Sequence, residues 1–184
     1  MFMPTQDSYY EMSATDFEKY SLDILRQQTR GLENLSITHN VIIEKGDGNY
    51  QIDGIIKFSV MGVNYTTLVE CKHYKGAISR EKVQVLYDKI RATGAHKGIL
   101  IATSNFQSGA IKYASEHGIA LVQITEAGTH FETRSQFGVI QARHNLYNGV
   151  LPYIGVMQES KDIGITCKYL RAYSTQLKDF LLDK

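Results

Sequence analysis

The chain has 184 residues, of which 43% are hydrophobic, and its formal net charge is +1. This length and apolar content allow one buried core, so the composition excludes a disordered chain and favours a single domain with at most a small appendage. No apolar run approaches the roughly 18 residues of a membrane span, and the first residues lack the basic and then apolar pattern of a secretion signal. We therefore expect a cytoplasmic protein with no membrane partner.

The chain has two cysteines, Cys71 and Cys167, and they lie far apart. Neither has the spacing of a metal-binding cluster, so we expect free thiols in a reducing compartment. A disulfide-stapled domain and a zinc site are both disfavoured.

The first part of the chain combines one helical pattern with extended patterns. Residues 13–31 carry apolar side chains at helical spacing and predict an amphipathic helix of about 15 residues. Residues 35–46 and 50–60 are rich in β-branched side chains and flank "GDGN", so they predict two strands joined by a tight turn. A third strand is expected over residues 63–74.

From residue 79 onward, helices and strands alternate. The pattern predicts a helix over 79–95, a strand over 98–104, a helix over 107–118 and a strand over 119–125. This order implies right-handed crossovers and parallel pairing. We therefore predict an α/β fold of three layers, in which helices flank a mixed central sheet formed by an antiparallel hairpin that feeds parallel strands.

The pattern weakens after Gly128. Residues 166–184 then place apolar side chains on one stripe and predict a C-terminal helix. We divide the chain into a domain over 1–128 and a C-terminal extension over 129–184, which we expect to be a packing or dimerisation element.

Basic residues gather just after the third strand. Residues 71–97 contain seven Lys or Arg residues against Glu81 and Asp88, a local net charge of +5. Such a cluster is typical of a surface that contacts a phosphate backbone, and it is about as typical of a solvated helix face.

Three ionisable residues converge at the end of the third strand. If the second and third strands are joined by a turn centred on Met61 and Gly62, Asp53 lies directly opposite Glu70; a longer turn would shift it toward Lys72. Glu70 and Lys72 share one face because strand side chains alternate. Like charges placed opposite each other are destabilising, so something must offset the proximity of the two carboxylates.

A divalent cation is the usual compensation for two close carboxylates. Mg²⁺ prefers oxygen ligands and typically binds through one or two carboxylates, with water and substrate phosphate as its other ligands. Lys72 beside such a site would orient or deprotonate a water molecule, or stabilise charge on a phosphate. The cluster therefore predicts metal-assisted hydrolysis of phosphodiesters.

The same residues resemble a known family. The segments "IDG" at 52–54, "VECKHY" at 69–74, "VQVLYDKI" at 83–90 and "GILIATSNFQSGAIKYASEHGIALV" at 98–122 are similar to the Mrr-type restriction endonuclease domain of the PD-(D/E)XK nuclease superfamily. The resemblance covers roughly residues 14–125 and implies a restriction-endonuclease-like fold.

The resemblance implies roles for individual residues. Asp53 and Glu70 would bind the metal, with the backbone carbonyl of Cys71 as a further ligand, and Lys72 would be the catalytic lysine. The family also places a glutamine near the active centre, which corresponds here to Gln84; an exposed helical glutamine without a role is the competing interpretation.

Other positions carry weaker assignments. Glu18 matches a glutamate of the first helix that helps to bind metal, but Thr15 and Glu18 also form a capping-box pattern. His73 is a candidate DNA contact or simply a solvent-exposed histidine. The remaining candidates for contacts with nucleic acid are basic residues of the cluster: Lys75, Arg80 and Lys82.

The resemblance implies an Mg²⁺-dependent endonuclease acting on DNA, with Mn²⁺ as a substitute, in restriction or defence against foreign or modified DNA. Cutting both strands implies a homodimer or higher homo-oligomer. Specificity would come from a recognition or regulatory partner protein or from DNA shape, or it would be absent. The alternatives are a repair or Holliday-junction nuclease and, from another class, a non-catalytic subunit that binds nucleic acid.

Overall fold

A seven-stranded mixed sheet forms the centre of the molecule. We describe a computed structural model, in which residues 12–126, 153–161, 164–170 and 174–183 are placed. The strands lie in the order β1-β2-β3-β4-β5-β6-β7, with β3, β4 and β5 parallel and the other neighbours antiparallel. Their bounds are Glu33–Lys45 (β1), Gly48–Val60 (β2), Val63–Lys72 (β3), Lys97–Ala102 (β4), Ile119–Glu126 (β5), Tyr153–Lys161 (β6) and Gly164–Leu170 (β7).

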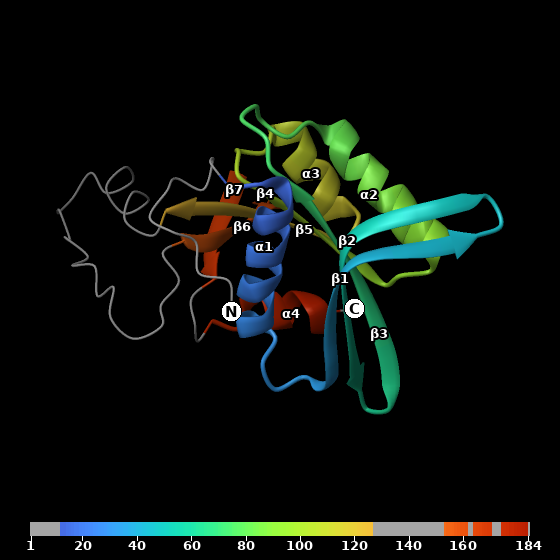
Figure 1. Ribbon diagram of the computed structural model, residues 1–184. Coiled ribbons are helices and arrows are strands. Elements are labelled where there is room, and N and C mark those ends of the chain that lie inside the picture. The colour runs from blue at the N-terminus through green and yellow to red at the C-terminus, as the bar shows by residue number, and fades with distance from the viewer. Residues whose placement is uncertain (1–11, 127–152, 162–163, 171–173, 184) are drawn as a thin grey trace.

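Helices cover both faces of this sheet, which confirms the predicted three-layer α/β architecture (Figure 1). One apolar core joins the sheet to α1 and α4, and a second joins it to α2 and α3. No helix among the described residues is long and apolar enough to cross a membrane. The helices are α1 (Ala14–Gln28), α2 (Arg80–Thr93), α3 (Ser108–Glu116) and α4 (Gln176–Leu182).

Helix α1 has the predicted length but not the predicted cap. Its N-cap is Ser13, whose hydroxyl accepts a hydrogen bond from the backbone N–H of Asp16 at 3.1 Å. Thr15 lies inside the helix, so the capping box expected from Thr15 and Glu18 is wrong. Ser13 is an equally good capping residue two positions earlier, and it leaves Glu18 free to point elsewhere.

The turn between β2 and β3 has the predicted position. Val60 pairs with Val63, and the two residues between them, Met61 and Gly62, have φ values of 51° and 82°. Positive φ at both central residues is the geometry of a two-residue hairpin turn. The pairing then continues without a shift to Gly54 and Val69.

The hairpin of β1 and β2 twists strongly near its middle. In β1, Ile37 packs in the core of α1 while Val41 packs in the core of α2 and α3, although alternation alone would put both on one face. In β2, Ile56 likewise packs in the core of α1, while Ile52 packs in the core of α2 and α3. Asn40, between the two parts of β1, has a φ of 50°. In Figure 1 the two strands change direction here, and the end of the hairpin extends past α2.

The C-terminal part of the chain differs from the prediction. Residues 166–170, expected in a helix, lie in β7, and of the described residues in the predicted range Gln176–Leu182 are helical. Leu170, Leu177 and Leu181 of the predicted apolar stripe still pack inward, in the core beside α1. A stripe of buried residues thus continues from an edge strand into a short helix. The division of the chain at residue 128 stays a proposal.

Gly54 allows α1 to approach β2 closely. A Cβ atom at this position would lie 2.5 Å from Cδ2 of Leu22 and 3.3 Å from its Cγ, and Leu22 is itself buried. We expect Gly54→Ala to lower the free energy of unfolding by about 1–3 kcal/mol through overpacking, as measured by urea denaturation.

Gly76→Ala is the matched control for this substitution. No atom lies within 4 Å of a Cβ built at Gly76, which is in the loop before α2. We expect a change within about 0.5 kcal/mol. Equal losses in the two variants would contradict a role for close packing at Gly54.

Candidate active site

Asp53 lies where the pairing of β2 with β3 ends. Gly54 pairs with Val69, so the next position along the same register brings Asp53 beside Glu70. Instead of a ladder bond, the backbone N–H of Cys71 donates to Oδ2 of Asp53 at 2.7 Å. The predicted proximity of Asp53 to the end of β3 is therefore present in the structure.

The environment of Asp53 favours its protonated form. Burial raises the pKa of its carboxyl, and the charges of Glu70 and Glu18 raise it further. The hydrogen bond from Cys71 and the charge of Lys72 act in the opposite direction but do not cancel the rise. Asp53 thus holds a negative charge at a cost that a nearby cation would remove.

Glu70 is a buried carboxylate held between two lysines. Its Oε1 atom lies 2.7 Å from Nζ of Lys72, and its Oε2 atom lies 2.9 Å from Nζ of Lys89. The Glu70 side chain is only 8% exposed, against 20% for Lys72 and 19% for Lys89. A buried charge needs such partners, because an unpaired carboxylate would lose its hydration without compensation.

Lys72 is cationic at neutral pH. Burial lowers the pKa of its ammonium group, but the hydrogen bond and charge of Glu70, together with the charge of Asp53, outweigh burial, so the pKa lies above its usual value. A lysine in this state donates hydrogen bonds and stabilises negative charge; it does not accept a proton.

Cys71 contributes its backbone, while its side chain belongs to the opposite face. Its thiol is buried in the core beside α1, and burial raises its pKa well above the usual value, so the thiol is neutral. Its N–H points toward Asp53. A strand residue directs its N–H and C=O to the same side, so the Cys71 carbonyl faces the same edge.

Glu18 lies near the site but has another partner. Its Oε2 atom is 2.7 Å from Nε2 of His39, a residue paired with Gly54 across the hairpin. Its charge still raises the pKa of Asp53, which places it close to that carboxyl. In the described structure Glu18 is therefore an outer neighbour of Asp53.

The structure places Gln84 on α2 and His73 against α1. Gln84 is exposed on α2 and, within the described residues, makes no hydrogen bond to Asp53, Glu70 or Lys72. His73 is half-buried against Phe17, with ring centroids 5.3 Å apart, so the expectation of a solvent-exposed histidine is wrong.

Lys89 was missed as a site residue because its signal is weak in the sequence. It counted only as one charge in the basic cluster, and its position on α2 gives no sign of a carboxylate partner nineteen residues earlier in the chain. In the sequence, Lys89 stands next to Ile90 and three residues after Leu86, both on the buried stripe of α2, and this adjacency was the available hint.

The basic cluster of residues 71–97 is not one surface. Lys72 and Lys89 contact Glu70, and Lys97 donates to the backbone carbonyl of Phe180 at the far end of β4. Lys75 and Arg80 are exposed and Lys82 is half-buried, and Arg80 lies over the ring of Tyr113 at 4.9 Å. The positive surface beside the site is therefore smaller than the sequence suggests.

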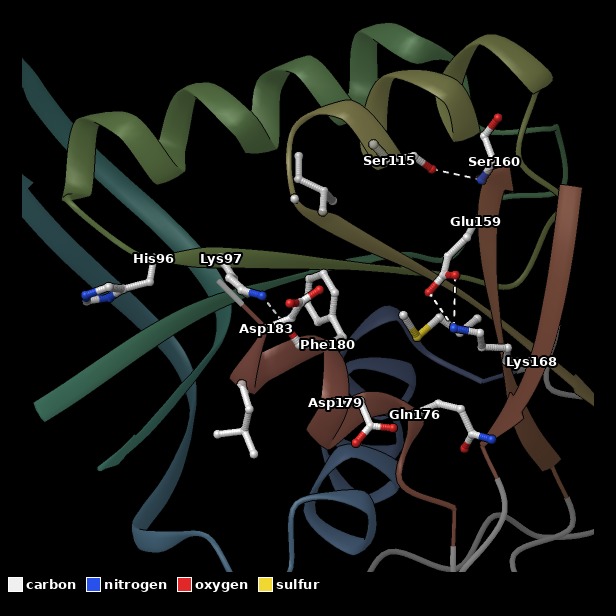
Figure 2. A pocket seen from close by; sticks show the side chains of 15 residues that line it. His96, Lys97, Ser115, Glu159, Ser160, Lys168, Gln176, Asp179, Phe180 and Asp183 are labelled. Carbon is white, nitrogen blue, oxygen red and sulfur yellow. Dashed lines mark hydrogen bonds and ion pairs between the residues drawn. The ribbon is translucent and has the colours of Figure 1, made fainter. Parts of the chain in front are cut away.

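A cavity of about 970 Å³ lies at the other ends of the parallel strands, away from the carboxylates (Figure 2). Of the polar side chains that line it, Lys168 pairs with Glu159 and Lys97 donates to the backbone carbonyl of Phe180, while Oε1 of Gln176 is buried without a hydrogen-bond partner among the described residues. The lining charges are of both signs, and none of the lining residues is Asp53, Glu70 or Lys72, so the cavity is separate from the carboxylate cluster.

Comparison with known proteins identifies the family. A family model described as a restriction endonuclease, of the Mrr catalytic type, matches residues 9–127. The chain belongs to this restriction endonuclease family. The matched residues contain α1, α2, α3 and strands β1 to β5, with Asp53, Glu70 and Lys72 among them.

The chain is also similar to individual proteins. The chain is 27% identical over 136 residues to the Type IV methyl-directed restriction enzyme EcoKMrr of Escherichia coli (strain K12), a match that covers 72% of this chain and 42% of the relative. Among solved structures, it is similar to the protein of unknown function AF1548, with 18% identity, a TM-score of 0.49, and coverage of 59% and 57% of the two chains. It is also similar to the DNA modification-dependent restriction endonuclease AspBHI, with 20% identity, a TM-score of 0.44, and coverage of 61% and 29%.

The residues of this restriction endonuclease domain fit a magnesium-type ion by their chemistry. Two carboxylates and a backbone carbonyl face one edge, all with hard oxygen donors, and burial raises the pKa of Asp53, so its charge carries a desolvation cost that a bound cation would offset. No group of three or more His, Cys, Asp or Glu side chains among the described residues could hold a metal. Mg²⁺ needs no more than one or two carboxylates with water, whereas zinc would need a fuller set of protein ligands.

The raised pKa of Asp53 predicts the pH dependence of stability without metal. As the pH falls, Asp53 is protonated in the folded protein at a higher pH than in the unfolded chain. The ionised carboxyl therefore lowers the free energy of unfolding above the folded pKa. This destabilisation disappears as the pH falls toward the usual pKa of 3.8. Asn at this position keeps an oxygen that can accept from Cys71.

We therefore expect Asp53→Asn to be more stable than the wild type at neutral pH in EDTA, with the difference shrinking toward about pH 4. Urea denaturation across this range measures the difference. A less stable variant at neutral pH would show that the Asp53 charge is already compensated.

Proposed function

We propose that the protein is an Mg²⁺-dependent endonuclease that hydrolyses phosphodiester bonds of DNA. The observation that carries the proposal is the convergence of Asp53, Glu70 and Lys72 at the end of β3 in a chain of the restriction endonuclease family. The two acids would hold the cation together with the Cys71 carbonyl, and Mn²⁺ would substitute for Mg²⁺ at such oxygen ligands.

The bound cation would supply Lewis-acid chemistry, lowering the pKa of a water molecule and neutralising charge on the phosphate. Lys72 is the protein's own contribution to the transition state. Because its ammonium stays protonated, it donates to the attacking water or to a phosphate oxygen and stabilises the charge that develops there. We assign it no role as a general base.

Glu70 has a second task besides binding metal. Its Oε1 atom fixes the position of the Lys72 ammonium, so the acid and the lysine are oriented by each other. Gln84 and Glu18 stay proposed auxiliary residues. Gln84 would reach the substrate or the cation only if DNA approached α2, and Glu18 only if DNA approached α1.

Restriction of foreign or modified DNA is the proposed biological role. EcoKMrr is described as methyl-directed, and this chain spans about 42% of its length. We propose that recognition of the target lies outside residues 9–127, in the rest of the chain, in a partner protein or in DNA shape. A homodimer, with residues 129–184 as a contact element, would place two sites on the two strands.

Cleavage of DNA tests the enzymatic proposal. We expect cleavage of plasmid, methylated duplex or both with Mg²⁺ and none with EDTA, and a loss of about 10²-fold or more in rate for Lys72→Ala. Preference for a four-way junction would favour a repair nuclease instead. No metal-dependent cleavage of any substrate, single strands included, would favour a non-catalytic binding subunit.

The matched control for cleavage is Lys112→Ala. Lys112 is exposed on α3, outside the carboxylate cluster, so this substitution removes a lysine charge without touching the site. We expect the wild-type rate. Cleavage that survives Lys72→Ala but needs Mg²⁺ would sink the assignment of the catalytic lysine.

The exposed basic residues beside the site predict salt-dependent DNA binding. Lys75 and Arg80 are the exposed members of the cluster before and at the start of α2. We expect DNA affinity in EDTA to fall steeply with salt, and the slope of log K against log salt to shrink by about 1 for each of Lys75→Ala and Arg80→Ala. A slope that neither substitution changes would exclude this surface as the phosphate contact.

A further inference from the structure

Lys89 is an ionic partner of Glu70 that the proposed mechanism does not use. It extends from α2 across to β2 and β3, where its Nζ lies 2.9 Å from Oε2 of Glu70 and 2.9 Å from the backbone carbonyl of Gln51. Its side chain is 19% exposed, nearly the same as that of Lys72. The site therefore has two lysines, supplied by two different elements.

The two lysines occupy both oxygens of Glu70. Lys72 holds Oε1 and Lys89 holds Oε2, so a cation that binds between Asp53 and Glu70 has to compete with an ammonium group. Lys89 is the one that can leave Glu70 without losing all its hydrogen bonds, because the carbonyl of Gln51 also accepts from it. Lys72 has no such second acceptor among its described hydrogen bonds.

The charges of the cluster lead to the same conclusion. Asp53 and Glu70 carry two negative charges, and Lys72 and Lys89 carry two positive charges, so the cluster is already near neutrality without metal. A divalent cation would then make it strongly positive, until the phosphate of the substrate arrives. Such a site binds its cation weakly on its own and more tightly with DNA.

We propose that Lys89 is an internal counter-ion that neutralises Glu70 in the metal-free protein and competes with the divalent cation for Oε2 of Glu70. The inference rests on the proposed function only in that Asp53 and Glu70 bind the cation. Lys89 is thus a positioning residue, which sets how tightly the cation is held before DNA binds.

Binding of Mn²⁺ and thermal unfolding test this role without any cleavage assay. We expect Lys89→Gln to bind Mn²⁺ about tenfold tighter than the wild type, because one competing positive charge is removed. In EDTA the same variant should unfold at a lower temperature, because Glu70 loses one of its two partners. The rise in unfolding temperature on adding Mn²⁺ should then be larger than in the wild type.

Two further variants make the result specific. Lys89→Arg keeps the charge and should keep the weak Mn²⁺ affinity of the wild type. Lys112→Gln removes a helix lysine away from the carboxylates and should change neither Mn²⁺ binding nor unfolding temperature. Glu70→Gln should abolish Mn²⁺ binding both in the wild-type background and in combination with Lys89→Gln.

The outcomes separate this inference from the proposed function. Wild-type binding of Mn²⁺ that Glu70→Gln removes, with no tightening in Lys89→Gln, overturns the role of Lys89 and leaves the proposed metal site standing. Weaker binding in Lys89→Gln also overturns it, because Lys89 would then support the ligand. No Mn²⁺ binding by the wild type or by Lys89→Gln overturns both.

Discussion

The pairing of β2 with β3 is set by a two-residue turn, and the position of every proposed reactive group depends on that pairing. Met61 adopts a positive φ that costs a residue with a Cβ roughly 1–2 kcal/mol, so the chain tolerates local strain at the turn. A shift by one residue would turn the side chains of one strand to the opposite face. Asp53 would then no longer meet the Cys71 N–H, and Glu70 would no longer lie level with it.

The twist of the β1 and β2 hairpin makes room for this contact. Between Ile56 and Ile52, the side chains of β2 pass from the core beside α1 to the core beside α2 and α3. The pairing of β2 with β3 ends in this part of the strand, so the Cys71 N–H has no backbone partner in β2. The Asp53 carboxylate takes that place. A backbone hydrogen bond thus orients an acid that burial would otherwise disfavour, and the sheet itself supplies the orientation.

Some features followed from local rules, and others required knowledge of distant contacts. Strand alternation predicted the Asp53 and Glu70 pair once the turn was centred on Met61 and Gly62, which was one of the two turns considered, because both depend on neighbouring residues. Lys89 meets Glu70 only after α2 packs across β2 and β3, which no local pattern encodes. The C-terminal error has a related cause: Leu170 and Leu177 share one core although one lies in a strand and the other in a helix, so their spacing mimicked a single helical stripe.

The additional strands β6 and β7 extend the sheet on the side away from the site. β6 pairs with β5 and β7 pairs with β6, while α4 adds Leu177 and Leu181 to the core beneath α1. Helix α1 is also the element that Gly54 lets approach β2, and it carries Glu18 close to Asp53. Packing from the C-terminal segments therefore supports the helix that closes one side of the carboxylate cluster, although none of the cluster's described hydrogen bonds or ion pairs comes from those segments.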